Sequence, residues 1–344
     1  TRWKKLPSWI INHGLSCLPG AAGSIGMGCI GFPSHPVIEV TSNCNLECIH
    51  CHVSKVREDS SELSTEECKN LLDQLARIQD FRMVAFTGGE PLMRKDFYQL
   101  LRYSSSLGFQ NTMATNATLI NDRTARKLKE NGLSIAAVSL DGVNKKTHDR
   151  IRGEKGAFEA AISGIKALCK ANILVQINFT AMGENLIQIE KFLNMTQDLN
   201  TGIVLAYQLV PIGRGKKISD SVLDKRKNER LLYDLMKYQK TNSAVIEPVA
   251  GPQYWPLILN KTGLDNGKSL KFAEKIFHGC SAGRGFVYIN SVGQVWPCPF
   301  IEVNCGNVRE KDFTHIWFSS SVLNDLRNRE KLLEGNCGKC RFIS

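Results

Sequence analysis

Residues 44–51 read Cys-Asn-Leu-Glu-Cys-Ile-His-Cys, so Cys44, Cys48 and Cys51 fall within eight residues of one another. They directly follow the apolar segment 36–41, which has the composition of a short β-strand. Three thiolates on one short loop can bind three irons of a four-iron cluster and leave the fourth iron open to another ligand. A zinc site completed by a neighbouring histidine is the alternative, although zinc usually binds two separated cysteine pairs.

Apolar strand-like segments alternate with helix-like segments after this loop. Strands are expected over residues 36–41, 83–87, 111–115, 134–140, 173–181 and 203–210, and helices over 64–80, 95–106, 121–131, 157–171 and 185–199. This alternation predicts βα units around a parallel sheet. We therefore expect an α/β fold, a partial (β/α)6 barrel of the TIM type, with the active site at the carboxyl ends of the strands.

A second motif supports this placement. Residues 88–91 read Gly-Gly-Glu-Pro and directly follow the strand expected over residues 83–87. In this order, at consecutive strand ends, the two motifs resemble the radical S-adenosylmethionine (SAM) superfamily. The resemblance implies that Cys44, Cys48 and Cys51 hold a [4Fe–4S] cluster whose open iron binds SAM. It also implies that an electron cleaves SAM to methionine and a 5′-deoxyadenosyl radical, which takes hydrogen from the substrate, while the protein supplies position and excludes water.

The same resemblance implies SAM contacts along the strand ends. The residues that match are His50, Gly88, Gly89, Glu90, Pro91, Asn116, Ser139, Arg152 and Asn178. The glycine turn and its Glu90 would hold the amino group, and a guanidinium can form a forked pair with a carboxylate. A solvated charge is the alternative for Arg152, and a turn or capping role is the alternative for Asn116 and Asn178.

Five of the twelve cysteines lie in the C-terminal part of the chain. The spacing of Cys280, Cys298, Cys337 and Cys340 resembles the SPASM domain or its shorter form, twitch. The resemblance implies a second, auxiliary [4Fe–4S] cluster without an open site, with Cys305 as an alternative ligand. A zinc site formed by the same cysteines is the other reading.

Three regions are expected along the chain. Residues 1–35 form an N-terminal arm without acidic residues, which could be a lid or a membrane-surface segment. Residues 36–244 form the barrel, and residues 245–344 form the auxiliary domain, truncated at its C-terminus, with a hairpin over 286–298 and a helix over 312–327.

The substrate is less sharply indicated. Residues 208–215 and 298–310 resemble segments of SPASM enzymes of the alternative haem and haem d1 pathways. Those enzymes act on propionate side chains of tetrapyrroles. Arg214 and Lys216, beyond a strand's carboxyl end, are expected to meet those carboxylates, with a solvated basic loop as the alternative. Maturation of a ribosomal peptide through thioether or carbon–carbon crosslinks is a second reading, although only 35 residues precede the first strand. Modification of a membrane lipid is a third.

Composition agrees with an enzyme of this kind. The 344 residues are 42% hydrophobic and 22% charged, which is typical of a globular protein and excludes a disordered or collagen-like chain. The formal charge of +11 favours anionic partners. Because the basic residues are dispersed and no recognition motif accompanies them, we do not expect nucleic acid. The expected partners are a small-molecule or peptide substrate and an electron donor such as flavodoxin or ferredoxin, in a reducing cytoplasm.

Overall fold

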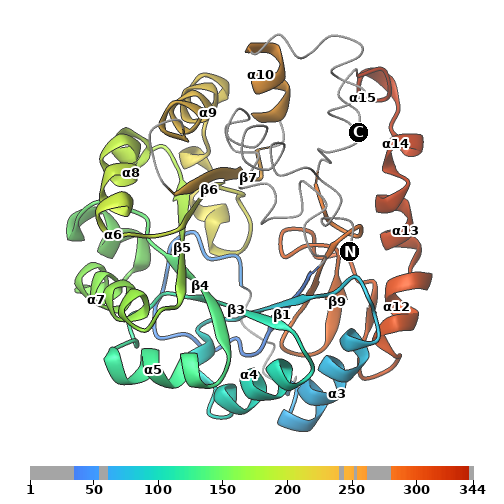
Figure 1. The fold of residues 1–344 in the computed structure, drawn as a ribbon. Coiled ribbons are helices and arrows are strands. Elements are labelled where there is room, and N and C mark those ends of the chain that lie inside the picture. Colours follow the sequence, from blue (N-terminus) through green and yellow to red (C-terminus); the bar gives the residue numbers. More distant parts are fainter. Residues whose placement is uncertain (1–34, 54–60, 240–243, 252–253, 262–279, 341–344) are drawn as a thin grey trace, which may run out of the picture.

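The computed structural model describes residues 35–53, 61–239, 244–251, 254–261 and 280–340 (Figure 1). In these residues one ten-stranded sheet has the order β10-β9-β8-β1-β2-β3-β4-β5-β6-β7. The strands are β1 (His35–Glu39), β2 (Met83–Thr87), β3 (Gln110–Thr115), β4 (Leu133–Ser139), β5 (Leu174–Ala181), β6 (Ile203–Gln208), β7 (Val245–Val249), β8 (Phe286–Ile289), β9 (Gln294–Trp296) and β10 (Gly306–Asn307).

Helices surround the curved sheet on its outer side (Figure 1). In chain order they are α3 (Thr65–Ala76), η3 (Pro91–Met93), α4 (Phe97–Ser106), α5 (Asp122–Glu130), α6 (Lys145–Arg152), α7 (Ala157–Lys170), η4 (Leu186–Gln188), α8 (Ile189–Asp198), η5 (Gly213–Ser221), α9 (Lys225–Gln239), α10 (Tyr254–Lys261), α12 (Phe313–Ser319), α13 (Ser321–Arg327), α14 (Arg329–Leu332) and α15 (Gly335–Gly338). The label η marks a 3-10 helix.

Alternation along each strand separates the core from the barrel interior. In β4, Ala136 and Val138 pack in the large apolar core under the helices. Ile135, Ala137 and Ser139 of the same strand instead line a cavity on the inner side. The sheet therefore stabilises the fold with one face and shapes a ligand site with the other.

The partial barrel predicted from the sequence is confirmed, and the sheet is wider than expected. All six predicted strands form and pair in parallel in chain order. A seventh strand, β7, continues the parallel series beyond residue 244, where the second region was expected to begin. At the other edge β8 pairs in parallel with β1, matching Val37 with Tyr288.

The C-terminal region is thus built onto the barrel sheet. The predicted hairpin is confirmed by the antiparallel pairing of β8 with β9. The helix expected over 312–327 is divided at Ser320, whose extended backbone separates α12 from α13. Phe313 and Trp317 of α12 pack on Phe81, with the rings of Phe81 and Trp317 centred 5.2 Å apart. The division of the chain at residue 244 stays a prediction, and the N-terminal arm lies outside the described residues, apart from His35.

None of the helices in the described residues combines the length and apolar character needed to cross a bilayer.

Candidate functional site

One cavity of about 660 Å³ occupies the inside of the barrel, a size typical of small-molecule sites. It brings together residues from every predicted motif except the Cys337–Cys340 pair. The predicted site residues that line it are Cys44, Cys48, His50, Cys51, Gly88, Gly89, Asn116, Ser139, Arg152, Asn178, Arg214, Cys280 and Cys298. Those that do not line it are Glu90, Pro91, Lys216, Cys305, Cys337 and Cys340.

The glycine turn after β2 holds the three-cysteine loop (residues 42–53) by close backbone contact. Gly89 N donates to Thr41 O over 2.7 Å, and Glu90 N donates to Asn43 O over 2.8 Å. A Cβ atom on Gly89 would lie 2.3 Å from Asn43 O, which is far inside contact distance. The sequence needs glycine here because the turn and the loop share the same space.

Hydrogen-bond donors point at the thiols of the loop. Leu46 N lies 3.4 Å from Cys44 Sγ, and Arg152 Nη1 lies 3.7 Å from Cys48 Sγ. Burial raises the pKa of Cys44 and Cys51, and at Cys51 the backbone of Val53 and the charges of Arg214 and Arg152 oppose this effect. Donors and a buried cation favour thiolates, the form that binds iron, so this donor set fits a cluster. Within the described ranges no three cysteine, histidine or acidic side chains are grouped as ligands of a metal ion.

A buried charged network lies directly behind the thiols. Asp141, which is fully buried, pairs with Arg152 over 2.6 Å from Oδ2 to Nη2. Burial alone would raise the pKa of Asp141, but Arg152 brings it below its ordinary value. His50 Nε2 lies 3.5 Å from the same carboxylate, and burial lowers the pKa of His50 to about 4, so this histidine is neutral.

Two nitrogen atoms of this network have no partner within the described part of the chain. They are Arg152 Nε and His50 Nδ1, and both are buried in side chains that line the cavity. Because a buried polar atom without a partner is costly, these atoms indicate that a polar ligand completes them. SAM, with its carboxylate and ribose, fits this requirement.

Glu90 does not face the cavity as the resemblance had implied. Its fully buried carboxylate accepts from Thr115 Oγ1 over 2.9 Å and from Asn116 N over 2.8 Å. Burial raises its pKa to about 7. Pro91, which begins η3, is buried outside the cavity as well. In this structure Glu90 fastens the turn to the end of β3, and of the four residues of the motif only the two glycines line the cavity.

The asparagines and the arginine that were predicted to contact SAM or substrate also form hydrogen bonds within the protein. Asn116 Nδ2 donates to Asn45 Oδ1 over 2.9 Å, and Asn178 Oδ1 accepts from Gln176. Arg214 Nε donates to Cys48 O over 2.7 Å, so this residue supports the three-cysteine loop while lining the cavity. Lys216 is exposed and does not line the cavity, contrary to expectation.

The auxiliary cysteines are divided between two places. Cys280 and Cys298 line the cavity, and burial raises the pKa of Cys298 to about 11. Cys337 and Cys340 are exposed near α15. Cys305 packs against the main core and its thiol lies 3.7 Å from Val303 O, so the geometry does not place it at the cavity.

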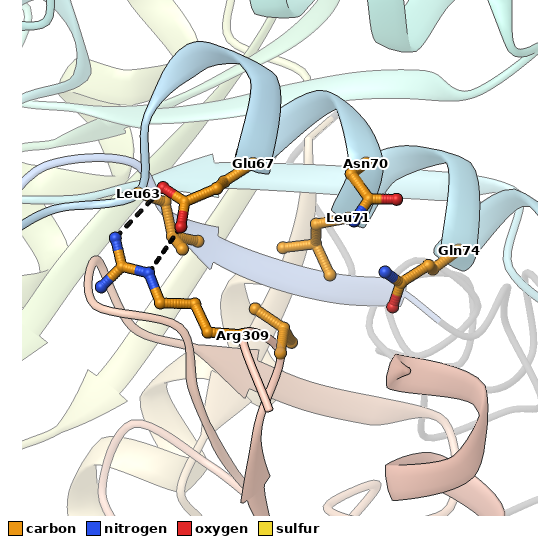
Figure 2. A pocket seen from close by; sticks show the side chains of 7 residues that line it. Leu63, Glu67, Asn70, Leu71, Gln74 and Arg309 are labelled. Carbon is orange, nitrogen blue, oxygen red and sulfur yellow. Dashed lines mark hydrogen bonds and ion pairs between the residues drawn. The ribbon is translucent and has the colours of Figure 1, made fainter. Parts of the chain in front are cut away.

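A clamp joins the C-terminal region to the start of α3 (Figure 2). Arg309 binds both carboxylate oxygens of Glu67, over 2.6 and 3.1 Å, and also donates to the carbonyls of Ser61 and Glu62. Glu62 Oε1 in turn accepts from Ser42 N over 2.7 Å, at the start of the three-cysteine loop. The clamp borders a separate small pocket of about 260 Å³.

Sequence reasoning missed Asp141 and this clamp. Asp141 stands in the run of residues 139–142 at the end of β4, and its charge at a strand end was a usable signal. Arg309 and Glu67 lie far apart in sequence, and no local pattern connects them.

Comparison with known proteins assigns the family. Residues 38–196 match the family model of the radical SAM superfamily, and residues 280–341 match that of the SPASM iron–sulfur cluster-binding domain. The chain therefore belongs to the radical SAM superfamily and carries a SPASM domain. It is an enzyme that uses SAM and iron–sulfur clusters.

Two relatives from one organism are similar to this chain over most of its length. The AdoMet-dependent heme synthase of Methanosarcina barkeri is 36% identical over 308 residues, which cover 88% of this chain and 87% of the relative. The Fe-coproporphyrin III synthase of the same organism is 33% identical, over 90% of this chain and 81% of the relative. Among solved structures, Streptococcus suis SuiB bound to its precursor peptide SuiA has a TM-score of 0.73 at 21% identity, covering 94% of this chain and 73% of SuiB. The likeness to SuiB shows the fold.

Proposed function

We propose that this enzyme applies radical SAM chemistry to a tetrapyrrole and that its target is a propionate side chain. The two relatives from Methanosarcina barkeri support this substrate, because their names describe tetrapyrrole products and each aligns with most of this chain.

The charge of the cavity lining is the observation that carries the proposal. Among the described residues the only full charges that line the cavity are Arg152 and Arg214; no Asp, Glu or Lys lines it. Asp141 balances Arg152 from behind the lining, so Arg214 supplies the positive charge that favours a carboxylate in the cavity. Tyr207, Tyr288 and Phe300 add aromatic surface on which a flat macrocycle can stack.

Different residues of the chain are proposed to hold the cluster and to bind SAM. We assign Cys44, Cys48 and Cys51 to the cluster that, when bound, supplies the reductive cleavage of SAM. Arg152 and His50 offer their unpartnered nitrogens to SAM. Gly88 and Gly89, together with Ser139 and Asn178, line the remaining space for it. The apolar inner faces of the strands exclude water around the reacting hydrogen.

The auxiliary cysteines lie beside the same cavity. Cys280 and Cys298 flank β8 and β9, which β1 separates from β2 and its glycine turn, and their position on the cavity wall supports a SPASM centre there. We assign Cys280, Cys298, Cys337 and Cys340 to the auxiliary cluster. Its role is to accept the electron that remains on the substrate after hydrogen abstraction.

The test is an anaerobic assay with iron-coproporphyrin III deuterated on its propionate chains. The expected result is deuterium in the 5′-deoxyadenosine formed and a changed tetrapyrrole mass. SAM cleavage without deuterium transfer, in the presence of this tetrapyrrole, contradicts the proposed substrate. Efficient transfer from a labelled precursor peptide would favour the alternative of a peptide maturase.

The cellular setting follows from the cofactor. A low-potential cluster is damaged by oxygen, so we place the enzyme in a reducing cytoplasm with a protein electron donor. Contact with a membrane surface through residues 1–35 stays a prediction, and a vesicle-flotation assay with and without those residues tests it.

A further inference from the structure

His52 directly follows Cys51 in the three-cysteine loop, and its half-buried side chain lines the cavity. Neither ring nitrogen of His52 forms a hydrogen bond or an ion pair with any residue in the part of the chain that the structure describes. His50 differs, because its Nε2 lies 3.5 Å from Asp141. A neutral imidazole keeps one nitrogen with a lone pair, and such a nitrogen is the commonest metal ligand in proteins. His52 therefore offers a ligand nitrogen on the wall of the site.

The backbone of His52 is held in place by the beginning of η5. Arg214 N donates over 2.9 Å to Cys51 O, the carbonyl that directly precedes His52. A Cβ atom on Gly213, whose φ is +53°, would lie 2.5 Å from Cys51 O and 3.0 Å from His52 Cα. Glycine suits both this φ and this close contact, so η5 can pass directly over the peptide group that carries His52.

The imidazole ring of His52 is itself oriented by Phe300. The two ring centroids are 5.4 Å apart and the ring planes meet at 69°, so this is an edge-to-face contact. Phe300 also lines the cavity, two residues after Cys298. This contact fixes the direction of the imidazole and leaves a nitrogen lone pair unused.

Arg214 brings a positive charge next to His52. Its Nε donates to Cys48 O over 2.7 Å, while no residue in the described ranges is paired with Nη1 or Nη2. An iron tetrapyrrole with propionate chains has a metal at its centre and carboxylates at its rim. An open imidazole beside an open guanidinium matches both groups, because histidine binds haem iron and arginine binds carboxylates. A peptide substrate would use the guanidinium and leave the imidazole without a metal.

We propose that a ring nitrogen of His52 is an axial ligand of the iron in the tetrapyrrole substrate. This inference rests on the proposed function, because it needs an iron tetrapyrrole in the cavity. In the binding step the nitrogen donates its lone pair and one iron–nitrogen bond forms, while the water that occupied the axial position leaves. No electron is transferred, so the iron keeps its oxidation state. The bond fixes the centre of the macrocycle beside the three-cysteine loop and leaves Arg214 available for a propionate.

The test measures tetrapyrrole binding to the reconstituted holoenzyme without SAM, so that no turnover occurs. The probes are iron-coproporphyrin III and metal-free coproporphyrin III. The variants are His52→Ala and His52→Gln, and the matched control is His315→Ala, which removes an exposed histidine of α12. Dissociation constants are measured for both probes, and absorption spectra record the ligation of the ferric iron. Pulsed EPR of the ferric complex is recorded on parent enzyme and His52→Ala protein whose histidines carry a heavy nitrogen isotope.

The expected result is a preference for the iron probe that depends on His52. The parent enzyme should bind iron-coproporphyrin III roughly tenfold more tightly than the metal-free probe, because only the iron gains a bond to the imidazole. Both His52 variants should lose this preference and keep the parent's affinity for the metal-free probe, and added imidazole should restore the parent's absorption spectrum. The control should match the parent. In the labelled parent complex a histidine nitrogen should couple to the ferric iron.

Three outcomes would overturn the ligand role of His52. They are an iron preference that both His52 variants retain, an equal loss of this preference in the His315 control, or a labelled parent complex without histidine coupling. A coupling that persists in His52→Ala would also overturn it, because another histidine would then be the ligand. Iron content is measured for each variant, and where a variant loses its cluster the labelled parent complex alone decides. Failure of the parent to bind either probe would instead count against the proposed function.

Discussion

Asp141→Asn tests whether the buried pair behind the thiols acts as a unit. Asp141 and Arg152 are separated by 2.6 Å, and their side chains are 0% and 8% exposed. At an effective dielectric constant of about 20 their attraction is on the order of 6 kcal/mol, most of which offsets the cost of burying both charges. Removing one partner leaves Arg152 buried and uncompensated, so we expect a loss of roughly 3–5 kcal/mol in the free energy of unfolding.

A double-mutant cycle separates the pair from its surroundings. The variants are Asp141→Asn, Arg152→Gln and both together, measured by urea unfolding of the cluster-free protein followed by circular dichroism. Asparagine keeps the oxygen that accepts from Thr180 N over 2.8 Å, so that contact is retained. We expect a coupling of at least about 2 kcal/mol, within the range for contacting residues. Additive losses would show that Asp141 stabilises the fold independently of Arg152 and would refute the reasoning.

Three further predictions concern the frame of the site. The Gly89→Ala protein should fold yet lose roughly four irons per chain, because the new Cβ would displace the three-cysteine loop. The control Gly183→Ala, whose Cβ has ordinary contacts, should keep these irons. Equal iron content in both variants would contradict this role of Gly89. The pKa of Glu90 is raised from 4.5 to about 7, so the stability that this residue contributes is present at acid pH and is lost as pH rises through about 7. The variant Glu90→Gln should flatten this part of the curve of unfolding free energy against pH. An unchanged slope would show that another group causes it. Arg309→Gln should lower the free energy of unfolding by about 1 kcal/mol at pH 7, a small loss because the Arg309–Glu67 pair is partly exposed. The hydrogen bond from Arg309 lowers the pKa of Glu67 to about 2, so this loss should fade as pH drops from about 4.5 to about 2. A loss that does not depend on pH would argue against the ion pair.

The central strands could be predicted from the sequence because each is an apolar run bounded by turn residues. The capping box at Ser64 likewise marks the start of α3, and both of its hydrogen bonds are present. By contrast, the sequence does not predict α6, because this helix is short and polar. Three of its four buried residues, Thr147, His148 and Arg152, are polar and do not form an apolar stripe. The edge strand β7 and the pairing of β8 with β1 depend on which partner each strand finds, and local sequence does not contain that information.

The site shows the same division between local and tertiary information. Cys44, Cys48 and Cys51, which we assign to the cluster, could be singled out because their spacing is a local pattern. The direction of Glu90 could not, since Thr115 and Asn116 on a neighbouring strand compete for its carboxylate. Lys216 was expected in the cavity from its position after β6, but the turn of η5 decides which side of the loop it faces.

The pairing of β1 with β8 also governs when the site can close during synthesis. The first described strand of the barrel waits for a neighbour that lies some 250 residues further along, as the register of Val37 with Tyr288 shows. At ribosomal rates of 5–20 residues per second that interval lasts roughly 10–50 s. Throughout it the thiols of Cys44, Cys48 and Cys51 have been made, but the wall carrying Cys280 and Cys298 has not. The nascent chain therefore keeps one side of its proposed iron-binding site open until β8 has been made, and any iron and sulfide delivered in that interval meet an unfinished barrel.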